Sequence, residues 1–393
     1  MTRSASHSIL PPLTPEEQRQ SDAVSELIRG QIEAAGGVVS FESFMEAALY
    51  APGLGYYSAG ATKIGVGGDF VTAPEVSDLF GRCVARQCAQ VLSPEGGEIL
   101  EIGAGTGRLA ATLLQALADT GVLPQRYAIL EVSADLASRQ RAHLQKLPPA
   151  LRDRVVWLDR LPERPVRGVI LANEVLDALP FTRIELRGGV LHELGVAVED
   201  GTFVERERSP SAALAQAWSS LAGELPRPLP EDYRSEVCLR IEPWVAGVGA
   251  CLESGLFLLF DYGLPRAHYY HPERVEGTLR CHFKQRAHSD PFVNVGVQDI
   301  TAWVDFTRVA EAAVASNLEV LGFVTQSAFL LATGIEALAA QSGSILERVQ
   351  RAGEARRLLL PGEMGEAFKV MALGKDPERL LTGFSLQDLR RSL

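Results

Sequence analysis

One glycine-rich turn in this sequence has the residue types and spacing of a ligand-binding loop. The segment EILEIGAGTGRLAATLLQAL predicts a strand, a tight turn and a helix, with an acid two residues before the first glycine. The glycines follow the spacing GxGxG, whereas a dinucleotide-binding GxGxxG pattern would need glycine in place of Arg108. This spacing fits a loop that binds S-adenosylmethionine, in which the acid meets the cationic methionine end. A purely structural glycine turn is the alternative. The cofactor-binding candidates in this turn are Glu101, Gly103, Ala104, Gly105, Thr106 and Gly107.

A second acid follows the next predicted strand. The strand YAIL is followed by Glu131, 24 residues after Gly107, and a carboxylate there can accept hydrogen bonds from both ribose hydroxyls. The competing interpretation is a cap for the following helix, a role for which Ser133 also competes. Asp159, just past the third predicted strand, is a further candidate on the adenine side. The glycine turn and the acid in register together favour cofactor binding.

Paired acids follow the fourth predicted strand, in the segment ANEVLDALP. Glu174 and Asp177 lie three residues apart, which would place both on one face of a helical turn at the carboxyl end of the sheet. Methyl transfer is an in-line displacement, and two carboxylates can orient a cationic nitrogen and accept its proton. The alternative is that both are exposed acids at the start of a helix, where the helix dipole favours them. Asn173, just before them, is a candidate contact for the cofactor.

Strands alternate with helices through the middle of the chain, which predicts a parallel sheet with right-handed crossovers. GLFLLFDYG predicts a buried central strand, and LEVLGFVTQ with AFKVMALG predicts a closing strand pair. The predicted segments are N-terminal helices with a glycine-rich loop (1–93), the first part of the core (94–184), an inserted hairpin and helical subdomain (185–235), the core continued (236–263), a second insertion (264–319), and the closing strands with a C-terminal tail (320–393).

The N-terminal segment carries two predicted helices and a long loop. Apolar spacing predicts a helix from Glu16 to about Ala35 and a second helix capped by Ser40. Residues 50–81 are rich in glycine with interleaved aromatic side chains, a pattern that excludes a regular element and predicts a loop ordered by packing. Long ordered loops commonly cover sites, and a structural crossover is the alternative.

The composition narrows the class of protein. The 393 residues, with 46% hydrophobic and 22% charged, are typical of a globular chain with one large domain or two. The net charge of −11 argues against nucleic acid as a partner, because no excess of Lys and Arg exists to neutralise phosphates. The sequence contains no apolar run of about 18 residues, so it predicts no membrane span. The first fifteen residues lack the apolar stretch of a secretory signal. The five cysteines include no CxxC pair, which predicts reduced thiols, no metal site and a cytoplasmic-type compartment.

With these segments placed, the chain resembles the MidA family of S-adenosylmethionine-dependent methyltransferases, which includes the mitochondrial complex I assembly-factor arginine methyltransferase. The resemblance runs in order from about Phe41 to Leu373. The matching stretches are ALYAPGLGYYS, KIGVGGDFVTAPEVSDLFG, EIGAGTGRLA, ANEVLDALP, FLLFDYG, GTLRCHFKQRAHSDPF, VQDITAWVDF and PGEMGEAFKV. The resemblance implies an α/β fold with a Rossmann-like, seven-stranded methyltransferase sheet, a helical N-terminal region and inserted subdomains. It also implies S-adenosyl-L-methionine as cofactor and symmetric dimethylation of an arginine on a peripheral-arm subunit of respiratory complex I.

The resemblance also implies roles for residues outside the glycine turn. In the long loop, Asp69, Thr72 and Glu75 would close over the cofactor or help hold the substrate. Asp261 and Tyr262, at the end of the fifth strand, are expected to line the floor of the cleft. His282 and His288 lie in another shared segment, where a polar insertion explains them as well as catalysis does. The predicted catalytic residues are Glu174, Asp177, Glu75 and Asp69, and the predicted cofactor contacts outside the turn are Glu131, Asp159, Asn173 and Thr72.

Three functions remain open from the sequence. The first is a protein arginine methyltransferase with a protein substrate, and the second is a non-catalytic assembly chaperone of complex I on the same fold. The third is a small-molecule methyltransferase. The intact glycine turn and Glu131 argue against the second, while two large insertions and the long loop favour a macromolecular substrate over the third. The expected compartment is the cytoplasm for a bacterial protein and the mitochondrial matrix for a eukaryotic one. The oligomeric state, with a homodimer as one alternative, stays open.

Overall fold

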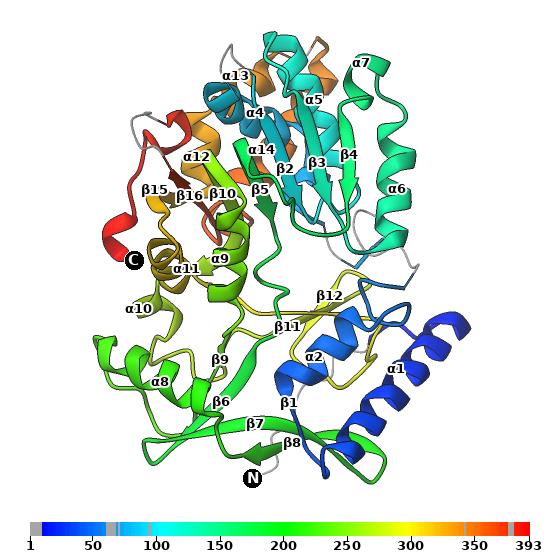
Figure 1. The fold of residues 1–393 in the computed structure, drawn as a ribbon, viewed down its shortest axis with the longest axis vertical. Helices are drawn as coiled ribbons and strands as arrows, with labels where there is room; N and C mark the ends of the chain where they lie inside the picture. The colour runs from blue at the N-terminus through cyan, green and yellow to red at the C-terminus, as the bar shows by residue number, and fades with distance from the viewer. Residues whose placement is uncertain (1–9, 60–67, 70, 93–95, 342, 376–380) are drawn as a thin grey trace. The chain divides into compact units, whose positions relative to one another are not determined.

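The computed structural model describes residues 10–59, 68–69, 71–92, 96–341, 343–375 and 381–393. The chain forms two compact units, each assembled from three stretches of sequence (Figure 1). The first unit comprises residues 1–70, 178–240 and 270–303, and the second comprises residues 71–177, 241–269 and 304–393. The glycine turn and the acids after the fourth core strand all belong to the second unit.

The second unit is built on one large sheet. Its strand order is β15-β16-β10-β5-β2-β3-β4, and β14 pairs with β10 outside that path. Neighbouring strands run parallel except β16, which is antiparallel to both β10 and β15. The strands are β2 (Glu98–Ile102), β3 (Arg126–Leu130), β4 (Val155–Leu158), β5 (Val166–Asn173), β10 (Leu252–Leu264), β14 (Val304–Asp305), β15 (Glu319–Thr325) and β16 (Phe368–Lys375). The path confirms the predicted Rossmann-like seven-stranded sheet and its closing strand pair.

Apolar side chains explain why these segments form a sheet covered by helices. The five residues 256–260 of β10 are each at most 2% exposed, which confirms the predicted buried central strand. Leu79 and Phe80 of α4 and Leu109 and Leu113 of α5 belong to the same buried cluster, so these helices pack through their apolar faces.

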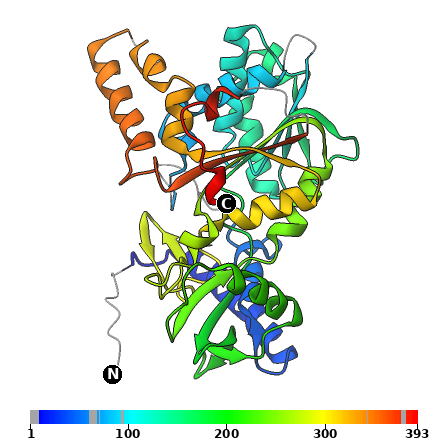
Figure 2. The same cartoon turned by 90° about the vertical axis from the view of Figure 1, so that its left-hand side faces the viewer.

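The helices of the second unit vary from single turns to four turns. They are α3 (Ala73–Val76), α4 (Asp78–Leu92), α5 (Arg108–Thr120), α6 (Ala134–Leu144), α7 (Pro149–Arg152), α9 (Ile241–Ala250), α10 (Arg266–Tyr269), α11 (Phe306–Ala315), α12 (Gln326–Ala332), α13 (Ile335–Ala340) and α14 (Ile345–Leu359), with short 3₁₀ turns η1 (Thr382–Phe384) and η2 (Arg390–Ser392). Figure 2 shows α13 and α14, in orange, as an adjacent pair. Across the described part of the chain, no helix combines the length and hydropathy that a bilayer crossing requires.

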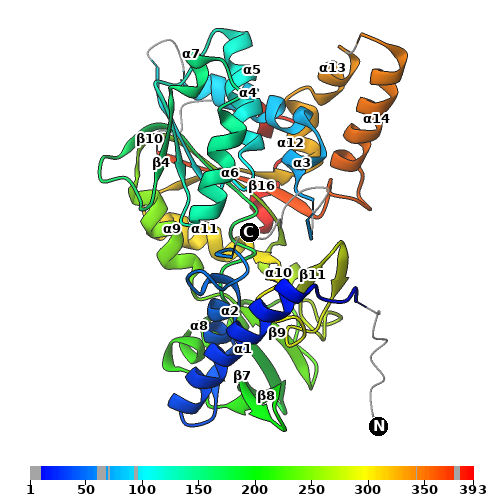
Figure 3. The same ribbon diagram turned by 90° about the vertical axis from the view of Figure 1, so that its right-hand side faces the viewer.

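The first unit combines two helices with two small sheets. One sheet has the order β1-β7-β6-β9 with β8 paired to β7, and the other has the order β12-β11-β13. Figure 3 shows α1 and α2, in blue, beside β7. The elements are α1 (Pro15–Ala34), β1 (Val39–Ser40), α2 (Phe41–Tyr50), β6 (Thr182–Arg187), β7 (Val190–Glu199), β8 (Thr202–Arg208), α8 (Ala212–Glu224), β9 (Tyr233–Val237), β11 (Arg280–Phe283), β12 (Arg286–His288) and β13 (Asp299–Thr301).

Both N-terminal helices form as predicted. Thr14 and Glu17 make a reciprocal capping box at the start of α1, and the Ser40 hydroxyl accepts the N–H of Ser43 at the start of α2. Phe41 of α2 then stacks on Phe181, and Phe44 packs edge to face against Phe203 of the inserted sheet region. The aromatic contacts explain why the N-terminal helices and the inserted sheet fold into one unit.

The predicted loop over residues 50–81 is partly wrong. Residues 73–76 form α3 inside the segment, whereas α4 agrees with the helical apolar spacing that the sequence shows from Ser77 to Leu92. Thr72 is extended and Pro74 lies in the first helical turn, where its fixed φ favours a helix start. Residues 60–67 and 70 of this predicted loop lie outside the described residues.

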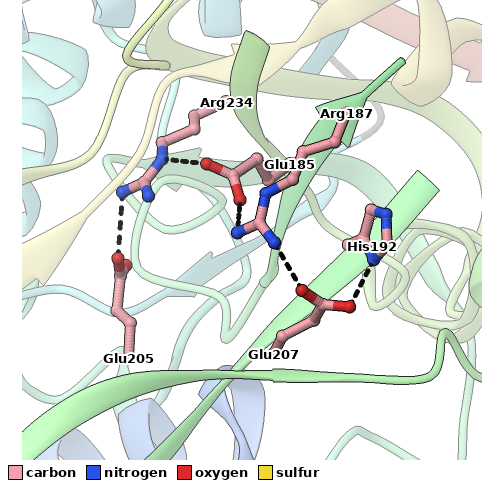
Figure 4. A network of polar contacts seen from close by, with 6 residues as sticks. All are labelled: Glu185, Arg187, His192, Glu205, Glu207 and Arg234. Atoms are coloured by element: carbon pink, nitrogen blue, oxygen red, sulfur yellow. Dashed lines mark hydrogen bonds and ion pairs between the residues drawn. The ribbon is translucent and has the colours of Figure 1, made fainter. Parts of the chain in front are cut away.

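A network of ion pairs crosses the inserted sheet of the first unit (Figure 4). Glu185 on β6 accepts a hydrogen bond from Arg234 on β9 at 2.9 Å and another from Arg187 on its own strand. Arg187 also pairs with Glu207 on β8, and Glu207 contacts His192 on β7 at 2.6 Å. Burial by itself would raise the pKa of Glu185, but its bonds to Arg234 and Arg187 bring that pKa below the ordinary value. The network therefore ties four strands together through side chains.

Candidate active site

The strand register places five of the predicted site positions along one edge of the large sheet. The register pairs are Leu158 with Leu130, Leu130 with Ile102, Ile102 with Ala172, and Asn173 with Phe260. Asp159, Glu131, Gly103 and Glu174 directly follow β4, β3, β2 and β5, and Asp261 lies within β10, one residue after the partner of Asn173. Ligands of open α/β sheets bind at the carboxyl ends of the strands, so this edge is the candidate active site.

The glycine turn adopts a backbone that only glycine takes without strain. Gly103, Gly105 and Gly107 have φ of 67°, 54° and 81°. The N–H of Gly103 donates to the carbonyl of Leu130 at 3.1 Å, which ties the turn to the neighbouring strand. A Cβ at Gly103 would lie 3.2 Å from the side chain of Val175, a tight contact. The turn is thereby held close to the segment that follows β5.

The acid that follows the second strand of the core is positioned by a residue that the sequence did not reveal. Glu131 accepts the N–H of Ser133 at 2.8 Å and the side-chain amide of Gln140 at 2.9 Å. The same amide donates to the carbonyl of Gly105 at 3.0 Å, while its oxygen accepts the indole N–H of Trp157. Burial raises the pKa of Glu131. Gln140 thus joins the glycine turn, the acid and β4 in one hydrogen-bonded group.

Glu101 lies beneath the glycine turn, out of contact with solvent. Its carboxyl group accepts the hydroxyl of Tyr127 at 2.7 Å, and both side chains are buried. Burial, opposed in part by this hydrogen bond, raises the pKa of Glu101 to about 7. A buried carboxyl group with so high a pKa suits a site where a cationic ligand arrives and stabilises the charged form.

Glu75 reaches the glycine turn from α3. One carboxylate oxygen accepts the hydroxyl of Thr106, and the other lies 3.6 Å from the guanidinium of Arg108 at the start of α5. Thr72 is the residue before α3 and is buried, with no side-chain capping bond. The structure therefore brings Glu75 to the predicted cofactor loop, while its catalytic role and the cofactor contact of Thr72 stay predictions.

The segment after β5 forms an irregular turn, so the predicted helical turn is wrong. The N–H of Glu174 donates to the carbonyl of Phe260 at 2.8 Å, and the N–H groups of Leu176 and Asp177 donate to the carboxylate of Asp261 at 2.9 and 3.3 Å. These bonds point the N–H groups at β10, and they hold Glu174 at a left-handed φ of 54°. Asn173 donates its amide N–H to Glu174 at 3.2 Å.

The turn and the end of β10 bring acids together. Asp177 and Asp261 are both buried, and Asp261 also accepts the N–H of Tyr262 at 2.9 Å. Burial, with the negative charges of Asp177 and Glu174, raises the pKa of Asp261 well above its ordinary value. Perturbed carboxyl groups at the ligand-binding edge of a sheet are candidates for acid–base or cation-binding work.

Asp69 belongs to the first unit and makes different contacts. Its carboxylate accepts the hydroxyl of Tyr56 at 2.9 Å and the N–H of Lys284 at 2.6 Å, and its carbonyl accepts the N–H of Gln285. These bonds tie the N-terminal loop to the turn between β11 and β12. They account for the burial of Asp69 without a substrate, and its predicted catalytic role stays a prediction.

Two histidines of the second insertion lie on that same small sheet. His282 is on β11 and His288 is on β12, and burial lowers the pKa of both. Across the described residues, no group of three or more His, Cys, Asp and Glu side chains is arranged to hold a metal ion.

The residues at the sheet edge fit S-adenosylmethionine. Glu131 has two oriented carboxylate oxygens for hydroxyl donors, and Gly103 exposes backbone beside them. The buried side-chain oxygen of Asn173 has no hydrogen-bond partner, which suits an N–H donor from a ligand. Val132, next to Glu131, is 79% exposed and offers an apolar surface suited to an adenine ring. Asp159 is exposed past the end of β4, and its contact with adenine stays a prediction.

Sequence reasoning missed two of these contributors. Gln140 shares the buried face of α6 with Leu136 and Leu144, and a polar residue on an apolar face was its only signal. Val132 stands between two polar residues after a strand, where nothing in the sequence marks it as exposed.

Comparison with known proteins agrees with this geometry. Residues 79–324 match a family model whose members are assigned as S-adenosyl-L-methionine-dependent methyltransferases. A crystal structure from Burkholderia thailandensis, bound to S-adenosyl-homocysteine, is 40% identical and covers 98% of this chain and 100% of that chain, with a TM-score of 0.92. A native crystal structure of an uncharacterized protein from the same organism is 41% identical with the same coverage and a TM-score of 0.90.

Curated relatives carry a more specific name. The protein arginine methyltransferase NDUFAF7 homolog of Drosophila melanogaster, described as mitochondrial, is 29% identical over 91% of this chain and 88% of its own length. The mouse protein arginine methyltransferase NDUFAF7, also mitochondrial, is 28% identical over 91% of this chain and 86% of its own. The human protein of that name is 27% identical over 86% of this chain and 80% of its own.

Proposed function

The chain belongs to this family of S-adenosyl-L-methionine-dependent methyltransferases, and from that premise we propose that it methylates arginine side chains of a protein. One observation carries the proposal. The acids Glu174, Asp177 and Asp261 gather at the ends of β5 and β10, and β5 is the strand next to the glycine turn. An acidic cluster beside a cofactor loop suits a cationic substrate, and the names of the curated relatives support arginine.

The chemistry explains why carboxylates would be needed. S-adenosylmethionine supplies, when bound, a methyl group on a positively charged sulfur. A guanidinium group stays protonated at physiological pH, so a nitrogen that attacks the methyl group must be oriented and must lose a proton. Glu174 and Asp177 would orient the guanidinium by charge-assisted hydrogen bonds and accept that proton, while Glu101, Glu131 and Asn173 would bind the cofactor.

A finer proposal concerns the product and the target. We propose symmetric dimethylation of an arginine on a subunit of respiratory complex I; the names of the relatives support the arginine, and the family resemblance implies the product and the target. An assembly chaperone without catalysis is less well supported, because the turn keeps three glycines at positive φ and the acid Glu131. The names of the eukaryotic relatives support a mitochondrial location for a eukaryotic bearer of this chain, for which we propose the matrix; for a bacterial bearer we propose the cytoplasm.

Isotope-labelled methyl transfer tests the proposal. The purified protein is incubated with methyl-labelled S-adenosylmethionine and purified peripheral-arm subunits of complex I, and modified residues are identified by mass spectrometry. Label on arginine supports the proposal, and fragmentation separates mono- from symmetric dimethylation. Label on lysine or on a small molecule overturns arginine methylation. Tight binding of S-adenosyl-homocysteine without any transfer favours the chaperone. Gly105→Val serves as the variant that cannot bind the cofactor.

A further inference from the structure

The end of β10 holds the turn that carries the two predicted catalytic acids. Three consecutive contacts make this clamp: the Phe260 carbonyl accepts the N–H of Glu174, and Asp261 accepts the N–H groups of Leu176 and Asp177. The second carboxylate oxygen of Asp261 accepts the N–H of Tyr262, so the carboxyl group is fixed in orientation. Two of the three backbone donors that fix Asp261 belong to the turn, so the position of the Asp261 carboxylate sets the position of the turn.

The clamp uses a group that is expensive to bury. A buried carboxylate that served only as a turn anchor would be placed away from other negative charges, because repulsion in a region of low dielectric is strong. Here Asp177 and Glu174 are near enough to repel Asp261. An asparagine could accept the N–H groups of Leu176 and Asp177 through its one oxygen without a charge, but its NH2 group could not accept the N–H of Tyr262. The second accepting oxygen explains why a carboxylate holds the turn despite this repulsion, and a cation received by the cluster would relieve the repulsion.

Resting on the proposed function, we infer that Asp261 is a positioning residue for methyl transfer: it sets the turn that carries Glu174 and Asp177, and its charge makes the cluster specific for a cationic nitrogen. A guanidinium between these acids would be attracted by three carboxyl groups. A neutral hydroxyl, amide or thiol nucleophile would leave the repulsion among the three carboxylates uncompensated. The cluster therefore selects against such a nucleophile.

The charged groups that face Asp261 come from neighbouring strands on both sides. Glu174 and Asp177 follow β5, and Lys369 lies opposite Asp261 in the register of β16. The Lys369 ammonium donates to the carbonyls of Ala367, at 3.3 Å, and Glu366, and burial lowers its pKa to about 8. Lys369 is thus engaged with backbone groups, and an incoming cation would supply the positive charge that the acids lack.

The ionisation of Asp261 gives the inference a distinctive pH signature. Burial and the neighbouring acids raise its pKa, so the proton leaves only above the ordinary range of an aspartate. A cation binds the ionised cluster better, so its affinity should rise as pH rises through the pKa of Asp261. Conversely, the bound cation should lower that pKa. A carboxyl group that only anchored the turn would show neither effect.

The first experiment compares Asp261→Asn with a matched control, Asp305→Asn. Asp305 is buried in the same unit and accepts two backbone N–H groups, of Thr307 and Arg308, at the start of α11. With S-adenosyl-homocysteine bound, affinity for the guanidinium ion at millimolar concentration is measured against pH. We expect Asp261→Asn to weaken guanidinium binding about tenfold and to flatten its pH dependence, with unchanged affinity for S-adenosyl-homocysteine. Asp305→Asn should keep the wild-type profile.

A second measurement does not depend on the folding of Asp261→Asn. Aspartate labelled with ¹³C at the carboxyl carbon is titrated by NMR in the wild type and in Asp305→Asn. Burial raises the pKa of Asp305 to about 6, so the control variant removes that competing signal. Burial also raises the pKa of Asp69, so the Asp261 signal is assigned as the one that Asp69→Asn retains, and this signal is expected to shift to lower pH when guanidinium is added. A midpoint that guanidinium leaves unchanged overturns the inference, as does an Asp261→Asn variant with the wild-type pH profile.

These outcomes separate the inference from the function on which it rests. Arginine methylation without any response of the Asp261 signal would leave the function standing and remove the role of Asp261. A guanidinium-dependent shift in a protein that methylates no arginine would retain a cation site and remove the proposed reaction. Supporting both requires the shift together with a KM for the arginine substrate raised about tenfold in Asp261→Asn.

Discussion

Tyr127 donates its hydroxyl to the carboxyl group of Glu101 across 2.7 Å, from the neighbouring strand and without access to solvent. Burial raises the pKa of Glu101 to about 7, so the folded protein keeps a proton there that an unfolded chain releases near pH 4.5. Because the folded state binds the extra proton, Glu101 makes folding less favourable as pH rises from about 4.5 through about 7.

Glu101 should make cofactor affinity rise with pH, whereas it makes folding less favourable with rising pH. A ligand cation favours the ionised carboxylate, so affinity for S-adenosyl-homocysteine should rise roughly tenfold per pH unit up to about pH 7 and then level off. We expect Glu101→Gln to bind weakly with no such dependence, as measured by calorimetry. Glu98→Gln, at the other end of β2 and paired with Arg126, is the control that should keep the wild-type slope. A wild-type slope in Glu101→Gln would place the titrating group elsewhere.

Substitution of Gly105 by valine should abolish cofactor binding. Gly105 has a φ of 54°, which a β-branched residue adopts only under strain. Gly121→Val is the matched control. Gly121 caps the end of α5, the helix that follows the glycine turn; it has a φ of 76° and open space around it. Calorimetry with S-adenosyl-homocysteine and thermal unfolding should show similar stability losses but a binding loss in Gly105→Val alone. Near-normal affinity in folded Gly105→Val would refute the site.

Gln140→Ala should weaken cofactor binding about tenfold, because the side-chain amide of Gln140 orients both Gly105 and Glu131. Gln326→Ala removes a buried glutamine of the same unit that donates to a backbone carbonyl in α14, so it matches the loss of a buried amide away from the edge. Equilibrium dialysis with labelled S-adenosyl-homocysteine distinguishes the two. Equal affinity in both variants would show that the amide only supports the fold.

Glu174→Gln and Asp177→Asn should each lower the rate of methyl transfer by about 10²-fold or more, as for loss of a positioned acid–base group, with cofactor affinity nearly intact. Single-turnover methylation of an arginine peptide and calorimetry on the same preparation provide the two readings. Loss of cofactor binding together with activity would place these acids in the cofactor site. Retention of both would leave Glu174 and Asp177 as acids of the turn with no part in binding or catalysis.

Removal of Glu185 should destabilise the first unit by about 1–3 kcal/mol, because Arg234 and Arg187 lose a buried acceptor. Its folded pKa lies below the unfolded value, so its contribution is present above about pH 4.5 and disappears as pH falls through the folded value. Urea unfolding of Glu185→Ala at neutral and acidic pH should therefore converge with wild type in acid. Glu199→Ala, from an exposed pair with Arg206, should change stability by less than about 1 kcal/mol at either pH.

Periodicity and glycine spacing predicted the sheet, its buried central strand and the cofactor turn, because these depend on local patterns. The assembly of α1, α2 and the insertions into one unit depends on contacts such as Phe41 with Phe181, 140 residues apart, which no local pattern records. The turn after β5 was expected to be helical because its acids are spaced by three. Its N–H groups instead bond to Asp261, a partner 84 residues away from Asp177.

The position of β16 has a consequence for synthesis of the chain. This strand spans residues 368–375, yet it lies between β10 and β15, inside the sheet. Until those residues leave the ribosome, β10 has an open edge on that side and β15 lacks the strand with which it pairs among the described residues. The nascent chain therefore carries an unpaired edge of β10 from residue 264, and of β15 from residue 325, until β16 is complete at residue 375, and such edges invite aggregation. A premature stop shortly before residue 368 would give a protein that contains the whole cofactor loop but lacks β16, so its sheet cannot close.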